Sequence, residues 1–115
     1  MEGYILAVDD DTSMRALLRS HLEATGRPVR VVASAGAAEE LALRAPPALI
    51  VSDVRLRVPS HIPVIYIGAG HPGAAEHLAK PLCAEALLAA VRRQLREPDI
   101  MIVSSPRWKR PSYNT

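Results

Sequence analysis

Short runs of apolar residues divide the chain, and polar or breaking residues separate them. Five of these runs have strand character, and they cover residues 4–8, 29–33, 48–53, 63–68 and 76–80. The first and third runs are almost wholly apolar, which is typical of strands that are buried on both faces of a parallel sheet. The sequence therefore predicts an α/β fold that is built on such a sheet.

Apolar residues recur at helical spacing in three further stretches, at residues 14–22, 37–45 and 83–96. Asp11 or Thr12 can cap the first helix, and Gly26 can end it. We expect a turn at residues 34–36 before the second helix. That helix ends before Pro46, because proline cannot continue a helix. Strands and helices thus alternate through the first half of the chain, as they do in doubly wound domains.

The pattern changes after the third strand. Only eight residues, Arg55 to Ile62, separate the third strand from the fourth. A crossover between parallel strands normally takes about a dozen residues or more and usually contains a helix. The next connection, residues 69–75, contains two glycines and a proline, which also argue against a helix. We therefore expect the helices after the third and fourth strands to be shortened or missing.

Length and composition bound the domain organisation. The chain has 115 residues, of which 49% are hydrophobic, so we expect residues 1–97 to form one domain with its own core. The single cysteine, Cys83, excludes an internal disulfide and suits a reducing compartment. No apolar run approaches the length of a membrane span, and the N-terminus has no signal-peptide pattern. We expect a cytoplasmic protein without membrane contact.

The net charge of +2 lies in a C-terminal extension, residues 98–115. There three basic residues outnumber Asp99, and the rest of the chain is neutral. Residues 99–104 of this extension have strand character, and the remainder is polar and basic, which predicts a disordered tail. Because the excess charge belongs to a tail, we do not expect a nucleic-acid-binding face.

Candidate chemistry gathers where two strands end. Asp9, Asp10 and Asp11 follow the first strand, and Asp53 ends the third. Ligands bind at the carboxyl ends of the strands in open α/β sheets, and these carboxylates meet there if the two strands are neighbours. Like charges in contact repel each other, and Mg²⁺ relieves the repulsion through the oxygen ligands that it prefers. The alternative interpretation of residues 9–11 is a helix N-cap cluster, because acidic side chains favour that end.

Three motifs end apolar strands in a particular order. They are Val8-Asp9-Asp10-Asp11 after the first strand, Asp53 after the third and Lys80-Pro81 after the fifth. Together they resemble the receiver domain of two-component response regulators, over roughly residues 3–96. The resemblance implies an α/β fold of the flavodoxin-like (CheY-like) type, with a parallel sheet of strand order 2-1-3-4-5. The Lys80-Pro81 bond is a candidate cis peptide, since the chain must turn sharply there while Lys80 points inward.

The resemblance implies a role for each residue of the motifs. Asp53 would be the phosphoacceptor, taking a phosphoryl group from a sensor histidine kinase or a phosphotransfer protein. Mg²⁺ would be the cofactor, bound by Asp10, Asp53 and the backbone carbonyl of Arg55, with Asp9 acting through water. Lys80 would pair with Asp53 or with a phosphoryl oxygen. Phosphoryl transfer depends mostly on positioning and charge neutralisation, which a metal ion and a lysine supply. The implied protein is a signalling module in a phosphorelay and not an enzyme.

The chain departs from the family where receivers relay the phosphorylated state. Receivers carry Ser or Thr at the end of the fourth strand, and Gly68 stands there in this chain. The aromatic switch position on the fifth strand falls at His77. Two hypotheses therefore stay open. The first is a receiver that is phosphorylated on Asp53. The second is a non-phosphorylated receiver-like module for interaction or dimerisation, in which the switch is degraded.

The missing helices also carry a structural expectation. In the family fold they cover one face of the sheet over the third, fourth and fifth strands. Their loss would bare that face, and the residues that we expect to be exposed there are Val51, Val64, Tyr66 and Leu78. A bare apolar patch of that size is uncommon on a soluble monomer. We therefore expect a homodimer, or another partner, to cover it.

Overall fold

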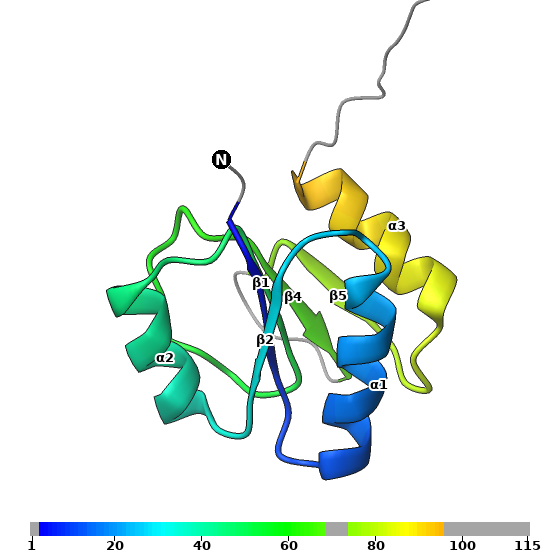
Figure 1. The fold of residues 1–115 in the computed structure, drawn as a ribbon, viewed down its shortest axis with the longest axis horizontal. Coiled ribbons are helices and arrows are strands. Elements are labelled where there is room, and N and C mark those ends of the chain that lie inside the picture. The colour runs from blue at the N-terminus through cyan, green and yellow to red at the C-terminus, as the bar shows by residue number, and fades with distance from the viewer. Residues whose placement is uncertain (1–2, 69–73, 96–115) are drawn as a thin grey trace, which may run out of the picture.

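The computed structural model describes residues 3–68 and 74–95, and its centre is a sheet of five parallel strands. The strands are β1 (Ile5–Val8), β2 (Val29–Val32), β3 (Leu49–Ser52), β4 (Val64–Ile67) and β5 (Glu76–Leu78). The helices within the described residues are α1 (Thr12–Glu23), α2 (Ala35–Arg44) and α3 (Ala84–Leu95). The strand order β2-β1-β3-β4-β5 confirms the predicted flavodoxin-like topology (Figure 1).

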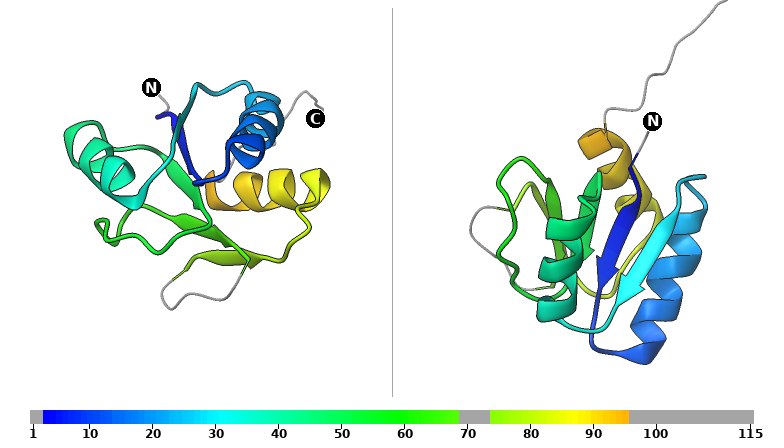
Figure 2. Two further views of the ribbon diagram at one scale, coloured as in Figure 1. Left: turned by 90° about the horizontal axis from the view of Figure 1, so that it is seen from below. Right: turned by 60° about the vertical axis from the view of Figure 1, so that its left-hand side comes forward.

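Helices cover both faces of the sheet and create two cores. Successive strand residues point to opposite faces. Ile5 therefore packs in one core with Leu18 of α1 and Leu87 of α3. Leu6 packs in the other core with Leu41 of α2. Figure 2 shows α1 and α3 on one side of the sheet and α2 on the other. This arrangement leaves the carboxyl ends of β1 and β3 free to form a site.

Side chains cap the first two helices. The Oδ2 atom of Asp11 accepts a hydrogen bond from the N–H of Met14 at 3.0 Å, which confirms Asp11 as the cap of α1. The Oγ atom of Ser34 accepts one from the N–H of Ala37 at 3.2 Å, and α2 begins at Ala35. The prediction of a turn at residues 34–36 is therefore wrong, because Ser34 acts as an N-cap and the helix starts directly after it.

An ion pair ties α3 to β5. The Nε and Nη2 atoms of Arg93 donate to the Glu76 carboxylate at 3.0 and 2.6 Å, and the side-chain amide of Gln94 donates to it at 2.7 Å. The hydrogen bonds from Arg93 are the main cause that holds the pKa of Glu76 below its ordinary value. The tie fixes the last helix against the strand that precedes Lys80.

The connection from β3 to β4 contains no helix, as expected, yet it covers the sheet. Leu56 and Ile62 from this connection are buried and pack with Val64 and Tyr66 on the α2 face. Val64 is 7% exposed and Tyr66 is 5% exposed. The expectation that these two strand residues would be bare is therefore wrong, because two apolar side chains of the loop do the covering that a helix would otherwise do.

The other two residues that we expected on the bare face lie on the opposite one. Val51 pairs with Ala7 of β1, and both belong to the core beneath α1 and α3. Leu78 packs against the same core. The four residues that we expected to form an exposed apolar patch therefore do not form one. The homodimer stays a prediction, but it no longer has this patch as its basis.

Several expectations about the chain ends fall outside the described residues. These are the strand at 99–104, the basic tail and the domain boundary at residue 97.

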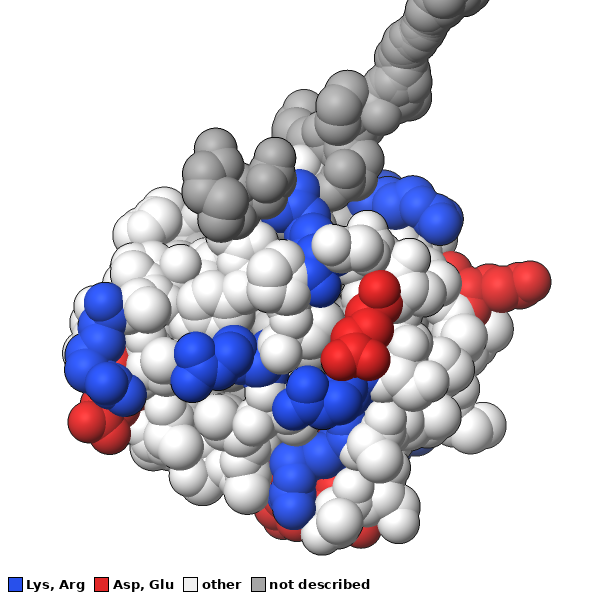
Figure 3. All heavy atoms as spheres, viewed as in Figure 1, with Lys and Arg blue, Asp and Glu red and all other residues white. Residues whose placement is uncertain are grey.

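None of the helices that the structure describes is long and apolar enough to span a membrane. Figure 3 shows Lys and Arg side chains dispersed over one face, with acidic side chains among them. Two of the ion pairs, Arg19–Glu23 and Arg44–Glu40, join residues one helical turn apart.

Candidate functional site

Three carboxylates converge at the carboxyl edge of the sheet. Asp9 and Asp10 follow β1, and Asp53 follows β3. Because β1 and β3 are adjacent and Val8 pairs with Ser52, the residues that come next lie side by side. One carboxylate oxygen from each aspartate lies within 4.8 Å of the other two. The structure thus brings together the acidic residues that the sequence singled out, in what we call the acidic cluster (Asp9, Asp10 and Asp53).

Asp11 has a different role from its two neighbours. It caps α1, and its N–H donates a hydrogen bond to Oδ1 of Asp9 at 2.9 Å. The Nη1 atom of Arg15 donates to the backbone carbonyl of Asp9 at 2.9 Å. Both contacts hold Asp9 in place at the end of β1. The N-cap interpretation therefore applies to Asp11, and the acidic cluster contains Asp9 and Asp10.

Two oxygen atoms of the acidic cluster are buried and have no hydrogen-bond donor among the described residues. They are Oδ2 of Asp9 and Oδ1 of Asp53. Asp9 is only 1% exposed, so water cannot freely solvate its carboxylate. Leaving a buried polar atom without a partner costs about 1–3 kcal/mol, and more for a charged group. A divalent cation would satisfy both oxygens, and carboxylates are the ligands that Mg²⁺ takes. The residues present therefore fit a Mg²⁺ site.

Burial is the largest of the causes that raise the pKa of the Asp53 carboxyl above its ordinary value. The nearby carboxylate of Asp9 raises the pKa further through its negative charge, and Asp10 adds to the effect. Lys80 opposes these effects and lowers the pKa. Without a cation, the surroundings of Asp53 thus disfavour its ionised form. A bound cation would favour that form.

Lys80 reaches the acidic cluster from the chain that follows the edge strand β5. Its Nζ atom lies 3.8 Å from Oδ2 of Asp53. The Lys80-Pro81 peptide bond is cis, as the sequence analysis proposed. The side chain of Asp53 is 13% exposed and that of Lys80 is 50% exposed. The lysine therefore lies at the open side of the site, where it can also reach a group that approaches from solvent.

The two switch positions differ in how they face the site. Gly68 has a φ of +97°, and its N–H donates to the carbonyl of Leu78 at 2.7 Å. A Cβ atom at Gly68 would lie 3.8 Å from Cε of Lys80, so the position borders the site but offers no side chain to it. His77 is exposed, and its ring stacks on Tyr66 with centroids 6.4 Å apart. Gly68 thus directly follows β4 and His77 lies within β5, and their role as degraded switch positions stays a prediction.

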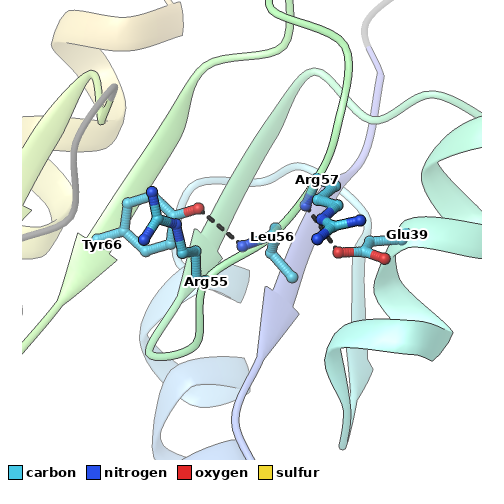
Figure 4. A pocket seen from close by; sticks show the side chains of 5 residues that line it. All are labelled: Glu39, Arg55, Leu56, Arg57 and Tyr66. Carbon is cyan, nitrogen blue, oxygen red and sulfur yellow. Dashed lines mark hydrogen bonds between the residues drawn. The ribbon is translucent and has the colours of Figure 1, made fainter.

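The loop after Asp53 is held by residues that the sequence analysis did not assign to the site. Oη of Tyr66 accepts a hydrogen bond from the N–H of Leu56 at 3.0 Å, and Glu39 accepts one from the N–H of Arg57 at 2.7 Å. Together with Arg55 these residues line a pocket of about 530 Å³ (Figure 4). The signal for Tyr66 was available, because a tyrosine in a buried strand needs a partner for its hydroxyl.

Comparison with known proteins supports the assignment of the fold. No family model matches the sequence, and no curated protein is similar enough to match it. Among solved structures, the chain is similar to a putative response regulator from Chloroflexus aurantiacus, with a TM-score of 0.72 and 24% identity over 84% of this chain and 100% of that one. It is also similar to the chemotaxis response regulator CheY4 of Vibrio cholerae, with a TM-score of 0.70 and 26% identity over 83% of this chain and 100% of that one.

A longer protein shows the same likeness over part of its length. NtrX from Brucella abortus has a TM-score of 0.68 and 24% identity over 84% of this chain. The chain spans only 27% of the length of that NtrX chain. The likeness to these structures concerns the fold. The chain therefore has the fold of a response-regulator receiver domain, with no helix between β3 and β4.

Proposed function

We propose that this shortened receiver domain accepts a phosphoryl group on Asp53, in a Mg²⁺-dependent phosphorelay. The observation that carries the proposal is the pair of buried oxygens without donors, on Asp9 and Asp53, next to the ammonium group of Lys80. In a cluster with a purely structural role, these two oxygens would stay without partners and would destabilise the fold. In a site that binds a cation and then a phosphoryl group, the same oxygens would serve as ligands.

The residues of the site divide the chemistry among them. A carboxylate oxygen of Asp53 attacks the phosphorus of a phosphohistidine on the partner, the phosphorus–nitrogen bond breaks, and the imidazole leaves with its electron pair. The product on this chain is an aspartyl phosphate. Asp10, Asp53 and the backbone carbonyl of Arg55 would bind Mg²⁺, with Asp9 acting through water. When bound, the ion would neutralise charge on the transferred group.

Lys80 supplies the second positive charge. With Nζ 3.8 Å from Asp53, it can move from the carboxylate to an oxygen of the arriving phosphoryl group. Such a preorganised charge stabilises the negative oxygens of the transition state. Its half-exposed position suits that role, because the phosphoryl group must enter from the solvent side.

The partners that follow from this function are a sensor histidine kinase or a phosphotransfer protein, and the chain would act in the cytoplasm as a signalling module and not as an enzyme. The likeness to solved structures of a chemotaxis response regulator and a putative response regulator supports this direction. We expect neither a membrane contact nor a nucleic-acid contact. The exposed face that suggested a homodimer is covered by residues of the β3–β4 connection.

A second candidate function rests on Gly68. Its φ of +97° and its lack of a hydroxyl leave no group at this position that could bind a phosphoryl oxygen. A phosphorylated Asp53 would therefore lack the usual relay through the end of β4. The alternative is a module that docks on a partner through its shape alone, without phosphorylation.

Phosphorylation with a small phosphodonor separates the two functions. The purified chain is incubated with acetyl phosphate and Mg²⁺, and its intact mass is measured. We expect one phosphoryl adduct that disappears in Asp53→Asn and in the presence of a chelator. If no adduct forms, even with excess Mg²⁺ and with histidine-kinase donors, Asp53 is not a phosphoacceptor. That result would favour the docking module.

A further inference from the structure

The peptide unit between Arg55 and Leu56 is held from one side by a tyrosine. The N–H of Leu56 donates to Oη of Tyr66 at 3.0 Å, and this hydrogen bond is buried (Figure 4). Tyr66 belongs to β4, ten residues further along the chain. A hydrogen bond to a buried hydroxyl fixes the orientation of the amide plane, because the peptide group is planar.

The same peptide unit carries the carbonyl of Arg55. In a planar trans peptide the C=O and N–H groups point in opposite directions. When the N–H of Leu56 points at Tyr66, the carbonyl of Arg55 points away from it. This carbonyl is the backbone group that we assign to Mg²⁺, so the inference rests on the proposed function. We propose that Tyr66 is a positioning residue. Its hydroxyl orients the Arg55 carbonyl toward the cation that the acidic cluster would bind.

The absence of a helix explains why such a residue is needed. A helix after β3 would hold successive peptide groups by its own hydrogen bonds. The loop here uses side chains instead. Ser52 Oγ donates to the carbonyl of Val54 at 2.6 Å and accepts from its N–H at 3.0 Å, and Glu39 accepts from the N–H of Arg57. Tyr66 holds the peptide unit between these two supports, and that unit contains the ligand carbonyl.

The tyrosine is itself well anchored. Tyr66 is 5% exposed and packs in the core of the α2 face. Its ring stacks on the ring of His77 at an interplanar angle of 29°. A buried side chain that also stacks on a second ring keeps its hydroxyl in one place, which a positioning residue must do. Residues that orient a metal ligand in this way change metal affinity about 10- to 100-fold when they are removed.

Calorimetric titration of the full chain with Mg²⁺ tests the proposal. We expect Tyr66→Phe, which removes only the hydroxyl, to weaken the affinity for Mg²⁺ about tenfold. Tyr4→Phe is the matched control, because the Tyr4 hydroxyl bonds the carbonyl of Ala45. Glu39→Gln is the second control, since it weakens the support of the next peptide group in the same loop. We expect both controls to stay within about twofold of the wild type.

A second measurement does not depend on how well the variant folds. In the wild type, coordination of the Arg55 carbonyl polarises the peptide unit that carries the Leu56 N–H. We expect Mg²⁺ to shift the amide nitrogen resonance of Leu56 more than that of Arg57, with the same apparent affinity that calorimetry gives. An unshifted Leu56 amide in a chain that binds Mg²⁺ would overturn the proposal.

The outcomes keep the inference and the proposed function apart. If the wild type binds Mg²⁺ and Tyr66→Phe binds it equally well, Tyr66 does not position a ligand, and the proposed function stands. If Glu39→Gln weakens binding as much as Tyr66→Phe, the effect is general loosening of the loop and the inference fails. If the wild type binds no Mg²⁺, the proposed function and this inference fall together.

Discussion

The ammonium group of Lys80 lies 3.8 Å from the carboxylate of Asp53, which shares the acidic cluster with the buried carboxylate of Asp9. Asp53 therefore has a positive neighbour and a negative one. The balance between them decides how easily Asp53 ionises and what it can attack.

Loss of the lysine should slow phosphoryl transfer far more than it disturbs the fold. We expect Lys80→Ala to lower the rate of adduct formation with acetyl phosphate about 100-fold, because it removes a preorganised charge from the transition state. Intact mass over time gives the rate. Arg92→Ala, which removes an exposed cation on α3, is the matched control and should react at the wild-type rate. A Lys80→Ala rate within twofold of the wild type would remove Lys80 from the mechanism.

The raised pKa of Asp53 should appear as a pH-dependent stability. Because the folded state holds the proton more tightly than the unfolded state, Asp53 costs nothing below its ordinary pKa of about 3.9. The loss of folding stability appears as the pH rises through the raised pKa of Asp53, and this loss is complete above that pKa. In a chelator, we expect Asp53→Asn to gain stability over the wild type between pH 4 and 8.

Urea unfolding at several pH values measures this difference. Saturating Mg²⁺ should reduce or reverse the gain, because the ion binds the folded wild type more tightly than the variant. Chelator curves for the two proteins that run parallel from pH 4 to 8 would show that the acidic cluster does not strain the fold.

The backbone at Gly68 should resist any side chain. We expect Gly68→Ala to destabilise the domain by about 1–3 kcal/mol, because its φ of +97° is strained for other residues even where space is open. Gly36→Ala is the opposite case, in the first turn of α2 with open space around it. It should stabilise by about 0.5–1 kcal/mol. Equal effects of the two substitutions on thermal unfolding would show that Gly68 is not in a left-handed conformation.

The loop that replaces a helix should carry part of the core energy. Leu56 is 9% exposed, and we expect Leu56→Ala to cost about 2–5 kcal/mol, as a buried leucine does elsewhere. Leu43 on α2 is 73% exposed, and Leu43→Ala should stay within about 0.5 kcal/mol of the wild type. Chemical denaturation measures both. A Leu56 variant as stable as the Leu43 variant would mean that the loop does not seal the α2 face.

The strands and the acidic cluster could be predicted because both depend on local pattern. Apolar runs mark buried strands, and the residue after each run lies at the carboxyl edge whatever the rest of the chain does. Asp9, Asp10 and Asp53 follow from that rule, and Lys80 was added by the resemblance to receiver domains. The cap of α1 at Asp11 follows from local chemistry in the same way.

The faces of the sheet could not be predicted from pattern. A strand that is apolar throughout gives no alternation from which to assign inward and outward sides. Val51 and Leu78 were therefore assigned to the wrong face. Leu56 and Ile62 were missed because their burial depends on how an irregular loop folds back on β4, which depends on contacts between distant parts of the chain.

The side-chain supports of the β3–β4 loop have a consequence for mutational tolerance. In a helix, peptide groups satisfy one another, so most surface residues can be exchanged freely. Ser52, Glu39 and Tyr66 accept hydrogen bonds from peptide N–H groups of this loop that have no backbone acceptor among the described residues. A segment with exposed arginines and no regular structure should therefore depend on the identity of its supporting residues more than α2, on the same face of the sheet, depends on its exposed residues. Random substitution should locate the intolerant positions of this domain in the residues that support the loop, as well as in the acidic cluster.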